Sequence, residues 1–77
     1  MTKRTFAIVL EPQSEGGYTV TVPALPEVVT EGDTEAEAIA MAREAIELAI
    51  EHRLSKGVDV PTGKDTVVRE IAIVAAA

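Results

Sequence analysis

The stretch GGYTVTVPALPEVVTEGDT, which spans residues 16–34, sets the order of the elements around it. Its paired glycines come shortly after a proline and a serine, as is typical of a turn between two strands. Apolar side chains then alternate with threonines over residues 18–22, which predicts a half-buried strand. Residues 27–32 predict another short strand, and Pro23 and Pro26 lie between the two.

The prolines cannot donate to a β ladder, so they end the first of these strands in a stiff bend. We expect this bend, PALP, to hold Leu25 outward beside Ala24. The whole stretch contains almost no reactive chemistry. It therefore indicates a surface for a partner rather than an active site.

Strands are also predicted at the two ends of the chain. Residues 5–10, TFAIVL, are nearly continuous in apolar side chains, which favours a strand in the interior of a sheet. Residues 11–17 form the turn that joins it to the next strand as a hairpin. Residues 66–74, TVVREIAIV, are rich in β-branched side chains and predict a fourth strand.

A long helix is predicted over residues 34–56. Thr34 and Glu37 form a capping box at its start, and Gly57 follows Lys56 at its end, where a left-handed residue is common. One stripe of this helix is expected to pack on the sheet, and it consists of Ile39, Ala42, Ile46, Ala49 and Ile50. The opposite face is acidic and is expected to be solvated, with Glu37, Glu44, Glu47 and Glu51.

Between these two faces lies a narrow apolar strip. Met41 and Leu48 are seven residues apart on the border of the acidic face, with Ala38 and Ala45 beside them. One sheet cannot cover a whole helix, so this strip is either additional core or a contact surface. The sequence leaves both interpretations open.

Composition limits the possible functions. The chain has 77 residues, which is one domain over 1–77, and a core of this size supplies about 3 to 5 kcal/mol. With no cysteine there are no disulfides to add to this stability, so we expect homo-oligomerisation, as a dimer or tetramer.

The net charge of −6 argues against binding nucleic acid and suits a basic protein partner. The N-terminal apolar run is too short for a signal peptide or a membrane span, which predicts a cytoplasmic protein.

The sequence contains few candidates for catalysis. His52 is the single histidine and has no neighbouring nucleophile that would make a catalytic pair. One histidine without cysteine leaves only carboxylates for a metal site, and the Gly-Gly pair lacks the context of a phosphate loop. We expect no enzyme activity, no catalytic residue, no metal and no cofactor.

The pattern of Gly-Gly-Tyr, an alternating strand, Pro-x-Leu-Pro, a short strand, Gly-Asp-Thr and an alanine- and glutamate-rich helix resembles the N-terminal domain of the HicB-like antitoxins. The resemblance covers residues 6 to about 61. The chain departs from it at Ala24, Glu27 and Val28, where the family usually has an aspartate, a glycine and a cysteine or similar small residue.

The resemblance implies an α+β fold, β-β-β-α-β, like a truncated ribonuclease H domain. In that fold a four-stranded mixed sheet of order 3-2-1-4 packs one long helix on one face. Nuclease activity is not implied, because a two-metal site needs several carboxylates at strand ends and residues 5–10 contain none.

The resemblance also implies a partner, a small basic HicA-type toxin that cleaves messenger RNA. Full-length members carry a C-terminal DNA-binding module, and no direct DNA binding is expected of this chain. The residues expected to contact a partner are Tyr18, Leu25, Pro26, Met41, Glu44 and Leu48. The alternative is an orphan homo-oligomeric interaction or scaffold domain with no cognate toxin.

Overall fold

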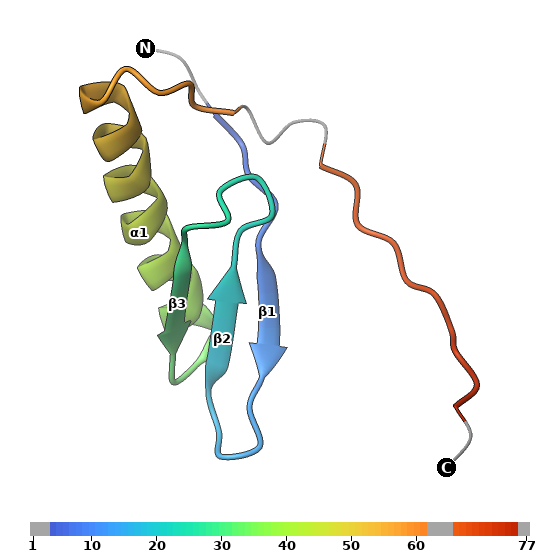
Figure 1. Cartoon of the computed structure of the whole chain (residues 1–77). Coiled ribbons are helices and arrows are strands. Elements are labelled where there is room, and N and C mark those ends of the chain that lie inside the picture. The colour runs from blue at the N-terminus through green and yellow to red at the C-terminus, as the bar shows by residue number, and fades with distance from the viewer. Residues whose placement is uncertain (1–3, 62–65, 76–77) are drawn as a thin grey trace.

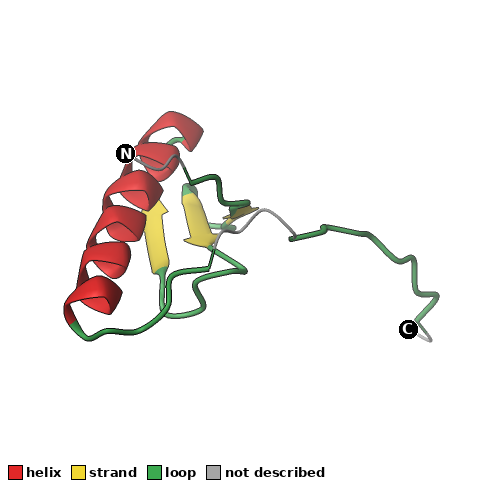
Figure 2. Ribbon diagram, turned by 90° about the horizontal axis from the view of Figure 1, so that it is seen from above, coloured by secondary structure: helices red, strands yellow, loops and turns green. Residues whose placement is uncertain are grey.

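A computed structural model describes residues 4–61 and 66–75 of the chain. The described part is an α+β domain in which three antiparallel strands, in the order β1-β2-β3, are followed by a helix that covers one face of the sheet (Figures 1 and 2). The elements are β1 (Val9–Pro12), β2 (Tyr18–Thr21), β3 (Val29–Gly32) and α1 (Glu35–Ser55). The predicted α+β class, with one long helix, is confirmed.

The turn between β1 and β2 lies where the sequence predicts it. Gly17 has a φ of +81°, and the backbone carbonyl of Gly17 accepts a hydrogen bond of 3.0 Å from the Gln13 N–H. A Cβ atom on Gly17 would lie 2.9 Å from the Gly32 carbonyl oxygen. Both the left-handed backbone and the close approach therefore require glycine at this position.

The first strand begins later than predicted. The sequence predicts residues 5–10, whereas β1 spans Val9–Pro12. In the register Val9 lies opposite Thr21, the last residue of β2, and Pro23 follows soon after. Residues 5–8 therefore extend past the end of β2, where the described chain offers no strand to pair with them.

The expectation that Leu25 points outward is wrong. Leu25 is fully buried and packs with Val22 and Val28 in one of the two clusters of the core. Two turns fold the bend inward, because the Leu25 N–H donates to the Val22 carbonyl at 3.0 Å and the Val28 N–H donates to the Leu25 carbonyl at 2.9 Å. This spacing of three residues brings the three apolar side chains together under the helix.

The helix begins and ends within one residue of its predicted bounds. The Thr34 side chain accepts a hydrogen bond of 3.1 Å from the Glu37 N–H, as the capping box predicts. Lys56 is the C-cap, and Gly57 follows with a φ of +70°. These signals depend only on neighbouring residues, which is why the sequence predicts them well.

The inward face of α1 is rotated from the predicted stripe. Ala38 and Ala42 are buried against Val20, and the other inward residues of the helix are Ala45, Ile46 and Ala49. Ile39, predicted to pack on the sheet, is 40% exposed. The small alanines allow α1 to lie close to the sheet, so the larger isoleucines at the edge of the stripe are only partly covered.

The predicted fourth strand, and with it the order 3-2-1-4, is not found. Residues 66–75 form no strand, and their side chains from Val67 onward are exposed. Figure 1 shows this segment running away from the domain on the side of β1. In the described part of the chain β1 pairs only with β2, so the position beside β1 that the fourth strand was expected to fill is open.

The sheet and the helix approach each other closely at Gly32. A Cβ atom on this buried residue would lie 2.7 Å from the Cα of Ala38 and would also clash with the Ala38 backbone nitrogen. Since these are backbone atoms, neither can move without displacing the first turn of α1. The glycine of the Gly-Asp-Thr motif is therefore required by packing.

We predict that Gly32→Ala lowers the free energy of unfolding by about 1–3 kcal/mol or more, because overpacking must push α1 off the sheet. Urea titration followed by circular dichroism measures this. Glu31→Ala is the matched control, since it changes the adjacent exposed residue and should stay within about 0.5 kcal/mol of the parent. Equal stability of the two variants would contradict the close packing of β3 and α1.

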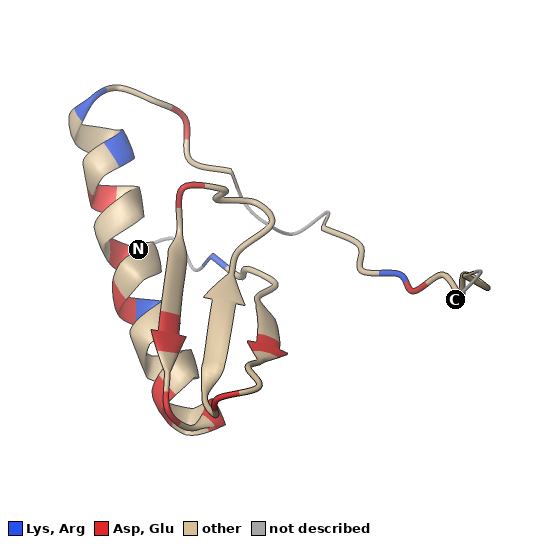
Figure 3. Ribbon diagram, turned by 60° about the horizontal axis from the view of Figure 1, so that its bottom comes forward, with Lys and Arg blue, Asp and Glu red and all other residues tan. Residues whose placement is uncertain are grey.

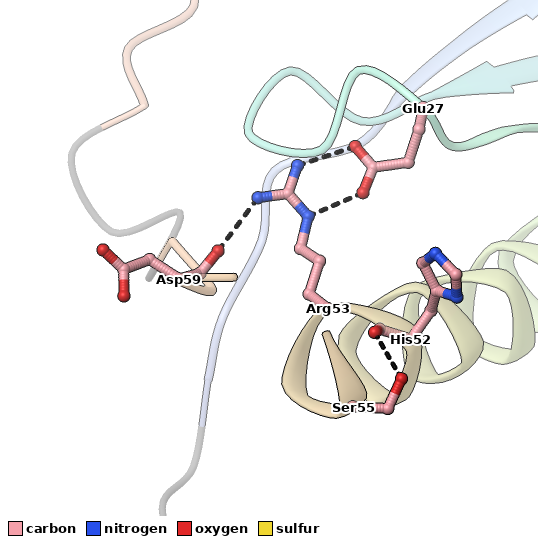
Figure 4. Close-up of polar contacts among 5 residues, drawn as sticks. All are labelled: Glu27, His52, Arg53, Ser55 and Asp59. Atoms are coloured by element: carbon pink, nitrogen blue, oxygen red, sulfur yellow. Dashed lines mark hydrogen bonds and ion pairs between the residues drawn. The ribbon is translucent and has the colours of Figure 1, made fainter. Parts of the chain in front are cut away.

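Arg53 ties the bend to the end of the helix (Figure 4). Its Nε and Nη2 donate to the two carboxylate oxygens of Glu27 at 2.7 and 2.8 Å, and its Nη1 donates to the Asp59 carbonyl at 3.0 Å. This bidentate ion pair with the Arg53 guanidinium lowers the pKa of Glu27 from 4.5 to about 2. Glu27 therefore joins residues that are far apart in the chain.

Acid should weaken this link in a defined pH range. Because the pKa of Glu27 is lower in the folded protein, the pair stabilises the fold fully above about pH 4.5 and loses that effect as pH falls toward 2. We predict that Glu27→Gln is less stable than the parent at pH 7 and that the difference disappears near pH 2. Urea midpoints measured from pH 7 to pH 2 test this. Glu51→Gln, which removes one negative charge from the exposed face of the helix, is the control and should not show the same convergence.

Candidate protein-binding surface

The six residues predicted to contact a partner do not lie together. Tyr18 is paired with Gly32 at the end of the sheet where the helix begins, and it is half-buried against the core. Pro26 is exposed in the bend, beside Glu27, which is bound to Arg53 near the other end of the helix. Tyr18 and Pro26 are thus near opposite ends of the domain.

Three of the predicted residues do share a surface. Met41, Glu44 and Leu48 are exposed on the same side of α1, and we call them the helix flank. Met41 is 40% and Leu48 is 60% exposed, so they are not additional core. Leu25, by contrast, is buried inside the domain and does not belong to its surface.

The sheet brings together acidic residues that the sequence analysis did not connect. Val20 faces the helix, so the neighbouring Thr19 faces the opposite, open side of the sheet. Glu11 and Glu31 are both register partners of Thr19 and therefore lie on this open side too. They are widely separated in the sequence, and only the pairing of the strands reveals that they form a row.

More carboxylates lie next to this row, at the end of the domain where the hairpin turns and the helix begins (Figure 3). Together they form what we call the acidic end: Glu11, Glu15, Glu31, Asp33, Glu35 and Glu37, all exposed. The described basic residues lie on other parts of the chain, at Arg4, Arg43, Arg53, Lys56 and Arg69. The acidic end therefore carries charge of one sign.

The electrostatic field of this end extends into solvent. Glu11 and Glu31 are separated by one strand, and two strand spacings amount to about 10 Å. This distance is comparable to the screening length of about 8 Å at physiological salt, so the electrostatic fields of the two carboxylates overlap. Their mutual repulsion is largely screened and destabilises the fold only slightly. The carboxylates can together attract a positively charged partner.

The described residues offer few candidates for metal binding or catalysis. No group of three or more histidine, cysteine, aspartate or glutamate side chains in residues 4–61 and 66–75 could hold a metal ion. His52 is exposed in the last turn of the helix, where its carbonyl accepts a hydrogen bond from the Ser55 hydroxyl at 2.7 Å (Figure 4). No helix in the described ranges has the length and apolar character that a membrane crossing requires.

The departures from the family pattern have structural roles at two of the three positions. Val28 is 5% exposed and belongs to the core, and Glu27 is the carboxylate bound by Arg53. Ala24 is half-buried in the bend. The bend of this chain is therefore held in part by the buried Val28 side chain and by the ion pair between Glu27 and Arg53.

Comparison with known proteins identifies relatives over most of the chain. A family model described as the HicB-like antitoxin of bacterial toxin–antitoxin systems matches residues 6–72. Antitoxin HicB 1 of Photorhabdus laumondii is 41% identical over 56 residues, which are 73% of this chain and 36% of that protein. A UPF0150 protein of Synechocystis is 37% identical over 68 residues, which are 88% of this chain and 85% of that protein.

This chain thus spans about a third of the length of the Photorhabdus antitoxin and most of the length of the Synechocystis protein. The family match includes the paired glycines, the bend, the Gly-Asp-Thr motif and the whole of α1. The resemblance inferred from that pattern is therefore confirmed, and the chain belongs to the HicB-like antitoxin family of bacterial toxin–antitoxin systems.

Proposed function

We propose that this protein is a cytoplasmic antitoxin that binds a small basic HicA-type toxin and blocks its cleavage of messenger RNA by protein contact. The family to which the chain belongs supports an antitoxin role. The observation that carries the choice of partner is the acidic end, six exposed carboxylates gathered by the strand register and the helix start. The proposal concerns toxin binding and includes no direct contact with DNA.

Charge explains how such contact would inhibit the toxin. A protein that cleaves RNA must present positive charge to the phosphate backbone. The acidic end offers carboxylates to the same positive surface, so the antitoxin and the RNA compete for it. Complementary charge also raises the association rate.

An apolar contact is needed for lasting affinity, because charged groups at the rim of an interface mainly affect the association rate. We assign this contact to the helix flank, where Met41 and Leu48 are exposed beside Glu44. Tyr18 and Pro26 are secondary candidates at either end of the domain. Leu25 is a core residue, and its contribution to binding is to hold the bend in place.

Co-expression tests the proposal directly. A gene for a small basic protein next to the gene for this chain should stop growth when expressed alone and should be tolerated when this chain is expressed with it. The two proteins should also co-purify. Growth arrest that this chain does not relieve, or the absence of any toxic neighbour, would favour the orphan interaction domain over the antitoxin.

Reversal of charge at the acidic end should slow binding. We predict that Glu11→Lys combined with Glu31→Lys lowers the association rate with the toxin about tenfold or more at low salt, with a smaller effect at high salt. Stopped-flow mixing over a range of salt concentrations measures this. The control, Glu51→Lys with Asp59→Lys, makes the same change in net charge at exposed positions away from the acidic end. An equal loss in both variants would mean that net charge alone, and not the acidic end, attracts the toxin.

A change on the helix flank should instead affect dissociation. We predict that Leu48→Glu raises the dissociation rate of the toxin complex at least tenfold. The physical reason is that replacing a central apolar side chain of an interface by a charged one weakens binding by about 1–2 kcal/mol or more. Val58→Glu is a matched control, since Val58 is also an exposed apolar residue, at 50% exposure, but lies beyond the end of α1 and away from the helix flank. An unchanged dissociation rate for Leu48→Glu would exclude the helix flank from the interface.

A further inference from the structure

An open groove of about 860 Å³ lies between α1 and the chain that leads into β1. Its apolar lining, which we call the apolar groove, consists of Phe6, Ile8, Ile39, Ile46, Ile50 and Leu54. Ile39 is 40% exposed and Leu54 is 61% exposed. An accessible apolar surface of this extent marks a place where another element packs.

The groove lies beside an open edge of the sheet. β1 is an edge strand, and residues 4–7 make no backbone hydrogen bond to any described residue. They extend past Thr21, the end of β2, and therefore have no partner on that side. A strand that lies along the free side of β1 could form hydrogen bonds with them. An unpaired edge of this kind accepts an added strand.

The C-terminal segment, residues 66–75, has the properties of the missing strand. Its exposed apolar side chains are Val67, Val68, Ile71, Ile73 and Val74, with exposures from 61% to 100%. All five are β-branched, which favours a strand over a helix. The segment forms no hydrogen bond with the described remainder of the chain, and Figure 2 shows that it leads away from the sheet.

We propose that two copies of this chain exchange their C-terminal segments. Residues 66–74 of each copy add a strand to the free edge of β1 in the other copy. Because side chains alternate along a strand, Val67, Ile71 and Ile73 share one face and lie over its apolar groove. Each copy then gives one strand and receives one. The assembly closes as a symmetric dimer with no unpaired edge at β1.

A second copy fits better than another occupant because the chain has both halves of the contact. Among the described residues it has an apolar groove with no covering element and a β-branched segment with no partner, and Figure 1 shows that this segment runs away from the domain. The charges are also complementary. Arg4, Arg43 and Glu47 border the groove, and the segment carries Arg69 and Glu70, so each sign can meet its opposite.

The absence of cysteine allows a direct test by cross-linking. Ala7→Cys places a thiol beside the free edge, and Ala72→Cys places one in the C-terminal segment. The two full-length variants, carrying different affinity tags, are mixed in urea, refolded together without any toxin and treated with a short bismaleimide. We expect a cross-linked species that contains both tags.

A second experiment uses a double variant with Ala7→Cys and Ala72→Cys in the same chain. If this variant cross-links only within one chain, each segment covers its own groove. If neither experiment gives a cross-link, the segment does not bind at the groove. Either result overturns the proposal.

Light scattering provides a second test. The parent should have a molar mass near twice the 8.1 kDa of one chain, and Ile71→Asp combined with Ile73→Asp should halve it. Leu48→Glu, which changes the helix flank, is the control and should leave the mass unchanged. A parent that is already monomeric, or a mass that falls with Leu48→Glu and not with the segment variant, would overturn strand exchange. Because toxin is absent from both tests, their outcome is separate from that of the proposed antitoxin function.

Discussion

The contact between Gly32 and the backbone of Ala38 is the constraint on which the rest of this domain depends. It allows no side chain at Gly32, so the first turn of α1 lies directly on the end of β3. The Thr34 cap begins the helix two residues later, and the helix then packs chiefly over β3 and β2. Because α1 is held on this side of the sheet, its other side, with Ile39 and Ile50, lies over residues 4–8, which form no strand.

The sequence predicts best the features that depend on neighbouring residues. The helix from its Thr34 cap to Lys56, the turn before Tyr18 and the bend between two prolines all follow from local steric preferences and hydrogen bonding. The family was also identified from such local motifs, and membership of an antitoxin family confirms the prediction that the chain is not an enzyme. These features require no knowledge of what the chain packs against.

The errors concern features that depend on distant parts of the chain. Prolines on both sides of Leu25 indicate a stiff bend, but they do not indicate which way it turns, and the hydrogen bonds that turn Leu25 inward involve only backbone groups. The acidic end depends on the strand register, which places Glu11 and Glu31 on either side of Thr19. The β-branched residues 66–74 show a preference for strand structure, but a strand also needs an edge to pair with, and composition does not specify that edge.

The position of α1 also separates two kinds of contact. The free edge of β1 and the apolar groove lie on one side of the helix, whereas the helix flank lies on the other and the acidic end lies where the helix begins. A strand from a second copy would thus bury apolar surface without covering Leu48 or the carboxylates of β3 and the helix start. Since that strand completes the core, folding and self-association become one equilibrium, and stability rises with protein concentration. A domain too small to hold a large core can in this way gain stability from its own copy and keep its charged surface available for a different partner.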